Sequence, residues 1–125
     1  MHRFLILVAV VAIFLVAGCA GGVKTYTDSE ETINIGVNQE FVIALDSNPT
    51  TGYSWQASYD ESILQLVGKS YEMGKAAKQG AVGAGGVDYF RFKTLKTGKT
   101  EIALVYKRVW EEESIDQKVF TVNIT

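Results

Sequence analysis

Residues 41–57 of the sequence, FVIALDSNPTTGYSWQA, contain two segments with apolar side chains at every second position, separated by a turn. These apolar positions are Phe41, Ile43, Leu45, Tyr53, Trp55 and Ala57. A period of two places alternate side chains on one face of a β-strand. Because the intervening residues include Pro49 and Gly52, which favour turns, this stretch predicts two strands joined by a tight loop.

The same alternation continues on both sides of this stretch, from about Thr32 to the last residue. The other expected strands are centred on Ile33/Ile35/Val37, Leu64/Leu66 running on toward Met73, Phe90/Phe92 with Leu95, Ile102/Leu104/Tyr106, and Phe120/Val122/Ile124. Short strands separated by turns predict an all-β fold, an immunoglobulin-like β-sandwich of about seven strands in two sheets. In such a fold we expect Trp55 in the core and residues 96–99 (KTGK) as a hairpin turn that uses Gly98.

Composition limits the chemistry that the chain can perform. It has 125 residues and a formal net charge of −2, which predicts a single folded domain and no nucleic-acid partner. The single His and the single Cys are His2 and Cys19, so residues 20–125 hold neither type. A domain without these residues cannot form a Ser-His-Asp triad, a thiolate nucleophile, a disulfide or a Cys/His zinc site. We therefore expect no enzyme, no catalytic residue, no cofactor and no metal; an enzyme that uses only carboxylates (Asp46, Asp88, Glu111–Glu113) is a weak alternative.

The first nineteen residues have the pattern of a targeting segment. Phe4 to Ala17 is a run of 14 apolar residues, short of the ~20 that a bilayer-spanning helix needs. Val16-Ala17-Gly18-Cys19 then resembles the lipobox of prokaryotic lipoproteins. We expect a signal peptide over 1–18, a lipid on Cys19, a polar tether over 19–31 and a folded domain over 32–125, held on a membrane outside the cytoplasm. The alternatives are an uncleaved anchor or a plain secretory signal that releases the protein.

Three segments between the expected strands have unusual composition. Residues 48–53 (NPTTGY) hold the single Pro, residues 74–86 (GKAAKQGAVGAGG) hold five Gly, and residues 107–113 (KRVWEEE) combine Arg, Trp and Glu. Each has an ordinary alternative: a well-made turn, a disordered loop, or a capping Trp beside a solvated acidic face. In an immunoglobulin-like sandwich, however, the three segments can emerge at one end. Together they predict a composite binding surface in preference to a catalytic site.

These segments carry a resemblance to a known family. Residues 48–55 (NPTTGYSW), residues 83–86 (GAGG) leading into DYFRF, and residues 108–111 (RVWE) are similar, in order and spacing, to the three signature segments of the chagasin family of cysteine protease inhibitors. The similarity extends over the body from about Thr32 to Thr125. One difference is Val109, where the family usually has Pro between the Arg and the Trp.

The resemblance implies a reversible inhibitor of papain-like cysteine proteases, whose three loops occupy the active-site cleft. The implied protease-binding residues are Asn48, Pro49, Thr50, Thr51, Gly52, Tyr53, Gly83, Ala84, Gly85, Gly86, Arg108, Val109 and Trp110. In this scheme Thr50 and Thr51 lie near the catalytic Cys/His pair, residues 83–86 run along the substrate cleft, and Trp110 packs against aromatic surface. We expect a monomer. The alternative is a non-inhibitory surface lipoprotein module that binds an envelope glycan or protein.

Overall fold

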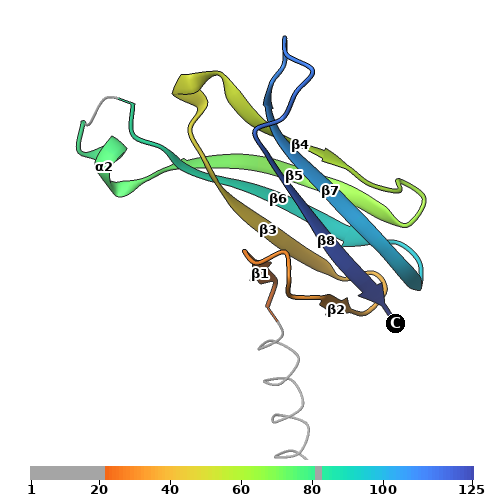
Figure 1. Ribbon diagram of the computed structural model, residues 1–125. Helices are drawn as coiled ribbons and strands as arrows, with labels where there is room; N and C mark the ends of the chain where they lie inside the picture. The colour runs from red at the N-terminus through yellow and green to blue at the C-terminus, as the bar shows by residue number, and fades with distance from the viewer. Residues whose placement is uncertain (1–21, 81–82) are drawn as a thin grey trace, which may run out of the picture.

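The computed structural model describes residues 22–80 and 83–125, which fold into two four-stranded β-sheets packed face to face (Figure 1). The strands are β1 (Lys24–Tyr26), β2 (Ile33–Ile35), β3 (Glu40–Ser47), β4 (Tyr53–Ser58), β5 (Leu64–Met73), β6 (Gly86–Thr94), β7 (Gly98–Arg108) and β8 (Asp116–Ile124). One sheet has the order β1-β3-β6-β5 and the other the order β2-β8-β7-β4. The predicted all-β sandwich of two sheets is confirmed.

The additional strand, β1, lies in the segment that we expected to be a tether. It pairs in parallel with β3, from Lys24 opposite Phe41 to Tyr26 opposite Ile43. Tyr26 is buried and meets the Phe41 ring edge-on at 6.3 Å. The sandwich therefore begins at β1 and not at Thr32. Three residues are too few to show an alternating pattern, so the sequence did not predict this strand; residues 1–18 and Cys19 lie outside the described residues.

The core lies between the two sheets and is built from the alternating positions that the sequence indicated. Its largest fully buried side chains include Phe41, Phe90, Phe92 and Phe120. Trp55 is also buried, as predicted, and its indole N–H donates to the backbone oxygen of Asp46 at 2.8 Å. Burying each side chain of this size contributes about 1.5–3 kcal/mol. The core thus holds the two sheets together without any covalent cross-link among the described residues.

The connection between β6 and β7 is not the predicted hairpin. Strand β6 has β3 on one side and β5 on the other, while β7 lies between β8 and β4 in the second sheet. The chain therefore crosses from one sheet to the other between Thr94 and Gly98. Gly98 does take a positive φ of 142°, as its position in a turn led us to expect. The prediction of a hairpin failed because both edges of β6 are already paired.

The long segment between β5 and β6 also differs from a structureless loop. It contains a short helix, α2 (Lys75–Lys78), whose Lys78 N–H donates to the Gly74 oxygen at 3.0 Å.

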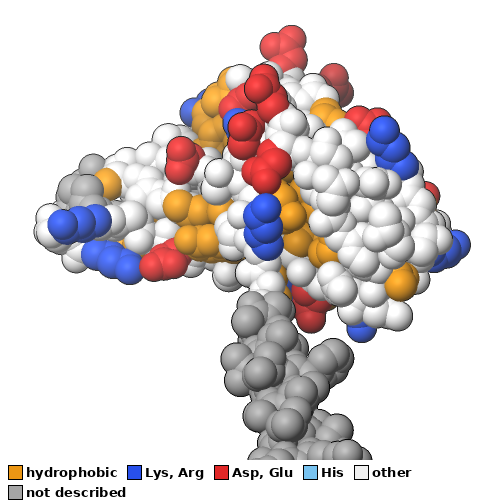
Figure 2. Space-filling model, turned by 90° about the horizontal axis from the view of Figure 1, so that it is seen from below, with side chains coloured by type: hydrophobic (Ala, Val, Ile, Leu, Met, Phe, Trp, Pro, Cys, Tyr) orange, Lys and Arg blue, Asp and Glu red, His pale blue; other side chains and the backbone are white. Residues whose placement is uncertain are grey.

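No helix within residues 22–80 and 83–125 is long and apolar enough to cross a membrane. Seen from below, apolar side chains form a band across the middle of the molecule, and acidic and basic side chains are interspersed around it (Figure 2).

Candidate binding site at the loop end of the sandwich

Three loops lie at the end of the sandwich away from the C-terminus (Figure 1). Loop 1 (48–52) joins β3 to β4, loop 2 (74–85) joins β5 to β6, and loop 3 (109–115) joins β7 to β8. Each loop leaves a strand of the packed core, so the sheets fix the positions at which the loops begin and end. The structure therefore brings together the three segments that the sequence singled out.

Loop 1 is ordered by hydrogen bonds to Asn48. This residue is extended (φ −135°, ψ 90°), as expected before Pro, and it caps the short helix η1 (Pro49–Thr51). Its side-chain oxygen accepts from the Thr50 N–H at 3.2 Å and the Thr50 hydroxyl at 2.5 Å. Its backbone oxygen accepts from the Thr51 N–H at 3.2 Å and the Thr51 hydroxyl at 2.7 Å. Gly52 closes the loop with a φ of 84°, so the predicted tight loop is confirmed.

Loop 2 is tied to loop 1 by the same Asn48. The Asn48 side-chain amide donates to the Gly83 backbone oxygen at 2.6 Å. A Cβ atom on Gly85 would lie 2.7 Å from the Ser47 oxygen, and one on Gly74 would lie 2.6 Å from the Gly85 oxygen. A Cβ atom on Gly86 would overlap the Glu72 oxygen. These glycines are required because backbones approach one another closely here.

Loop 3 contacts loop 1 through Arg108, the last residue of β7. The Arg108 Nε donates to the Thr51 backbone oxygen at 3.1 Å, and its Nη1 donates to Glu111 at 3.1 Å. Its guanidinium also lies over the Tyr53 ring, 4.4 Å from the ring centroid. Arg108 is thus engaged within its own chain, as are the side chains of Asn48 and Tyr53. The geometry gives these predicted contact residues the role of holding the loops in place.

The exposed part of the site lies on loop 3, where it is apolar, and on the tip of loop 1. Val109 and Trp110 are 71% and 69% exposed, while Pro49, Thr50 and Thr51 are exposed at the tip of loop 1. Trp110 lies beside Gly52, where an added Cβ atom would approach its ring to 2.7 Å. Because exposed aromatic residues are frequent anchors of protein interfaces, this surface fits a macromolecular partner.

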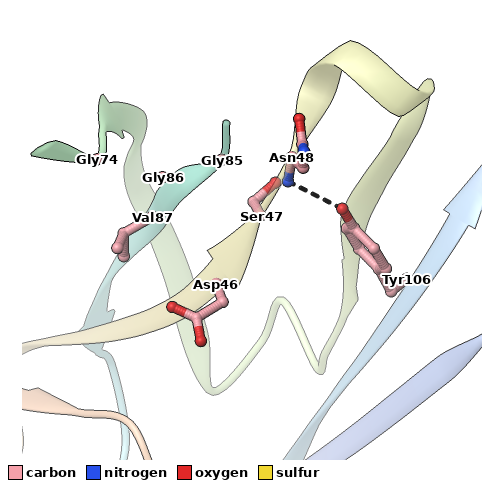
Figure 3. Close-up of a pocket in the computed structure, with 8 residues that line it drawn as sticks. All are labelled: Asp46, Ser47, Asn48, Gly74, Gly85, Gly86, Val87 and Tyr106. Atoms are coloured by element: carbon pink, nitrogen blue, oxygen red, sulfur yellow. Dashed lines mark hydrogen bonds between the residues drawn. The ribbon is translucent and has the colours of Figure 1, made fainter. Parts of the chain in front are cut away.

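A hollow of about 510 Å³ lies between loops 1 and 2 (Figure 3). Its lining residues are Asp46, Ser47, Asn48, Gly74, Gly85, Gly86, Val87 and Tyr106. Asp46 is its single carboxylate. In the register of β3 and β6, Asp46 is opposite Val87 and Leu45 is opposite Asp88, so Asp46 and Asp88 point to opposite faces of the sheet. These two residues therefore do not form the acid/base pair that the carboxylate alternative requires.

The described residues also contain no group of three or more His, Cys, Asp or Glu side chains that could hold a metal ion. Glu111, from the acidic run of loop 3, is paired with Arg108 at 3.1 Å. The site therefore presents backbone, small side chains and exposed apolar groups, which suit tight packing against a partner surface.

Sequence reasoning missed three residues at this end of the molecule. Ile115 is 62% exposed on loop 3, and Met73 is 48% exposed where β5 pairs with Gly86. Tyr106 lies beneath the loops and accepts a hydrogen bond from the Asn48 N–H. The periodicity of β7 placed Tyr106 on the inner face, but which element its hydroxyl meets depends on how the sheets pack.

Comparison with known proteins identifies the family. Residues 34–124 match the model of the chagasin family peptidase inhibitors, I42. Amoebiasin-1 of Entamoeba histolytica is 33% identical over 100 residues, which are 80% of this chain and 94% of that protein. Chagasin of Trypanosoma cruzi is 31% identical over 97 residues, which are 73% of this chain and 84% of that protein.

A solved structure shows the same fold. The crystal structure of the cysteine protease inhibitor EhICP2 from Entamoeba histolytica superposes with a TM-score of 0.69 at 27% identity, covering 82% of this chain and 95% of that one. The family match spans the sandwich from β2 to β8 and includes all three loops. The chain therefore belongs to the chagasin family of peptidase inhibitors.

Proposed function

We propose that this protein is a reversible, tight-binding inhibitor of papain-like cysteine proteases and that its three loops occlude the active-site cleft. The observation that carries the proposal is the joining of the loops into one surface, by the bonds from Asn48 to Gly83 and from Arg108 to Thr51. Membership of an inhibitor family and similarity to the cysteine protease inhibitor EhICP2 support it.

The geometry suits inhibition by steric occlusion. The hydrogen bonds around Asn48 fix loop 1 before any partner is met, which lowers the ordering cost of binding. A standard protein interface buries about 1,600 Å² in total, which is the scale of three adjacent loops at the end of a small sandwich. In the proposed complex the tip of loop 1 blocks the catalytic centre, and Trp110 packs beside it. No bond is broken, so the inhibitor is released unchanged.

Inhibition is tested by titrating papain and a cathepsin-L-like protease with the full-length chain in a non-ionic detergent, using a fluorogenic substrate and a serine protease as control. We expect the two cysteine proteases to be inhibited stoichiometrically. Thr51→Asp places a charge at the tip of loop 1 and should weaken inhibition; Thr97→Asp makes the same change on an exposed residue between β6 and β7 and should not. If the folded chain at micromolar concentration inhibits neither enzyme, a non-inhibitory surface module becomes the better account.

We propose in addition that a lipid on Cys19 holds the domain on a membrane outside the cytoplasm. The support is the sequence Val16-Ala17-Gly18-Cys19 after a short apolar run. More than one acyl chain on one residue gives stable anchoring, because each buried methylene contributes about 0.8 kcal/mol. Cys19→Ser should move the protein from the membrane fraction to the soluble fraction. Mass spectrometry that finds an unmodified, uncleaved N-terminus in the native protein would contradict this proposal.

A further inference from the structure

Tyr106 occupies a central position beneath the loops, although the packed core alone does not require its hydroxyl. It lies on β7, directly opposite Trp55 on β4. Its ring lies between two aromatic neighbours, with centroids 4.9 Å from Trp55 and 5.4 Å from Tyr53. These contacts fix the direction of the ring, because aromatic pairs at this separation attract each other.

The hydroxyl of Tyr106 reaches from one sheet to the other. It accepts a hydrogen bond from the Asn48 N–H at 2.9 Å, at the point where β3 ends and loop 1 begins (Figure 3). Asn48 in turn holds Thr50, Thr51 and Gly83. One side chain of β7 therefore sets the position of the residue on which both loop 1 and loop 2 depend.

The backbone of Tyr106 also holds the third loop. Its carbonyl oxygen accepts from the Ile115 N–H at 2.9 Å, which closes loop 3. Tyr106 is half-buried and lies at the base of the loops, whereas Thr50, Val109 and Trp110 are exposed at their tips. It is thus placed to orient the binding surface without contacting a partner.

We infer that Tyr106 is a positioning residue for the inhibitory surface, and that its hydroxyl holds Asn48 in the arrangement that binds the protease. The inference rests on the proposed function and adds a residue to it. If the hydrogen bond is lost, the binding-competent arrangement of loops 1 and 2 becomes one of several. The apparent affinity then falls in proportion to the fraction of molecules that keep this arrangement. The effect should appear mainly in the association rate, since a bound protease itself holds the loops.

The test is Tyr106→Phe, which keeps the ring stack and removes only the hydroxyl. The variant should fold, because Tyr106 lines the open hollow of about 510 Å³. A water molecule there can accept a hydrogen bond from the Asn48 N–H in place of the lost hydroxyl. The matched control is Tyr59→Phe. Tyr59 follows the far end of β4, and its half-buried ring packs on Phe92 with the two ring centroids 5.1 Å apart. Within the described residues the Tyr59 hydroxyl makes no hydrogen bond.

Two measurements are made on the full-length chain in detergent. The first is inhibition of papain, with association and dissociation rates; we expect Tyr106→Phe to weaken binding about three- to tenfold, through slower association, and Tyr59→Phe to leave it unchanged. The second is amide hydrogen exchange at Asn48, Thr51 and Gly52 in the free protein, which should become faster only in Tyr106→Phe.

The outcomes separate this inference from the proposed function. Inhibition by Tyr106→Phe at the wild-type rate and affinity overturns the inference and leaves the proposed function intact. If the wild type does not inhibit, the proposed function fails. In that case, amide exchange at Thr51 and Gly52 that is equally fast in Tyr106→Phe and in the wild type overturns the positioning role as well. If Tyr106→Phe does not fold, hydrogen exchange in the wild-type protein still tests the inference. An Asn48 amide that exchanges as fast as an unprotected amide would contradict its hydrogen bond to Tyr106.

Discussion

Loops 1 and 3 lie side by side but are ordered in different ways. Loop 1 has several hydrogen bonds of its own, in which Asn48 accepts from both Thr50 and Thr51, and it presents small polar groups. At loop 3, Glu111 is bonded to Arg108 at the end of β7, while Val109 and Trp110 project into solvent. Loop 1 contributes a fixed shape, and loop 3 contributes a large contact area.

This difference separates two ways of losing affinity. Removing an exposed side chain from loop 3 takes away contact and leaves the folded protein as stable as before. Removing a hydrogen bond from loop 1 keeps the exposed surface but raises the cost of ordering it. Measuring inhibition and unfolding on the same variants therefore distinguishes the two contributions.

The largest expected effect is that of Trp110→Ala. Exposed tryptophans at interface centres contribute about 2–4 kcal/mol to binding, so the inhibition constant for papain should rise about 100-fold. The unfolding midpoint should not change, because the side chain is 69% exposed. Ile115→Ala, on the same loop and 62% exposed, is the control for loss of apolar surface. Equal effects of the two variants would mean that Trp110 is not the anchor.

Gly52→Ala should have the next largest effect, since it disturbs both loops at once. A residue with a Cβ atom is strained at a φ of 84°, and the new atom would meet the Trp110 ring. We expect about thirtyfold weaker inhibition together with a loss of about 1–2 kcal/mol in unfolding free energy. Gly68→Ala provides the comparison, because a Cβ atom there meets nothing within 4 Å. Inhibition as strong as that of the wild type would show that loops 1 and 3 move independently.

Asn48→Ala tests the internal order of loop 1 together with its tie to loop 2. Loss of a helix-capping side chain costs about 1 kcal/mol, and the tie to Gly83 disappears as well. We expect inhibition to weaken about tenfold, with a parallel fall in the unfolding free energy measured by denaturant titration. Asn34→Ala, which removes a hydrogen bond that the exposed Asn34 side chain accepts from Asn123, should leave inhibition unchanged. If affinity falls while stability does not, Asn48 contacts the protease directly.

The smallest expected effect is a gain, produced by giving loop 3 the stiffness of loop 1. Val109 occupies the second position of a turn closed by the Glu111 N–H on the Arg108 oxygen at 3.0 Å, a position that favours Pro. Val109→Pro should tighten inhibition about three- to fivefold by restricting the free loop. The matched control is Val109→Ala, which changes size without fixing φ. Weaker inhibition by the Pro variant would show that loop 3 must move to bind.

The sequence was sufficient to predict the sandwich and the segments at the site, but not the bonds that join them. Alternation placed Phe41, Trp55 and Phe90 in the core, and the composition around Pro49 and Gly52 predicted a tight loop. Strand β1 was missed because three residues show no period. The hairpin after β6 was predicted wrongly because the choice of partner strand depends on which edges are free. The roles of Arg108 and Tyr106 depend on contacts between elements far apart in the chain.

The body of this protein, residues 20–125, contains no Cys, and this has a consequence in the redox environment of its proposed target. A cysteine protease works only while its nucleophilic sulfur is a thiolate and remains unoxidised. Small extracytoplasmic domains often depend on disulfides, and thiols that keep such an enzyme active exchange with exposed disulfides. An inhibitor folded by packing alone keeps its shape in the same reducing medium that activates the protease, and residues 20–125 hold no disulfide that the enzyme's thiolate can attack.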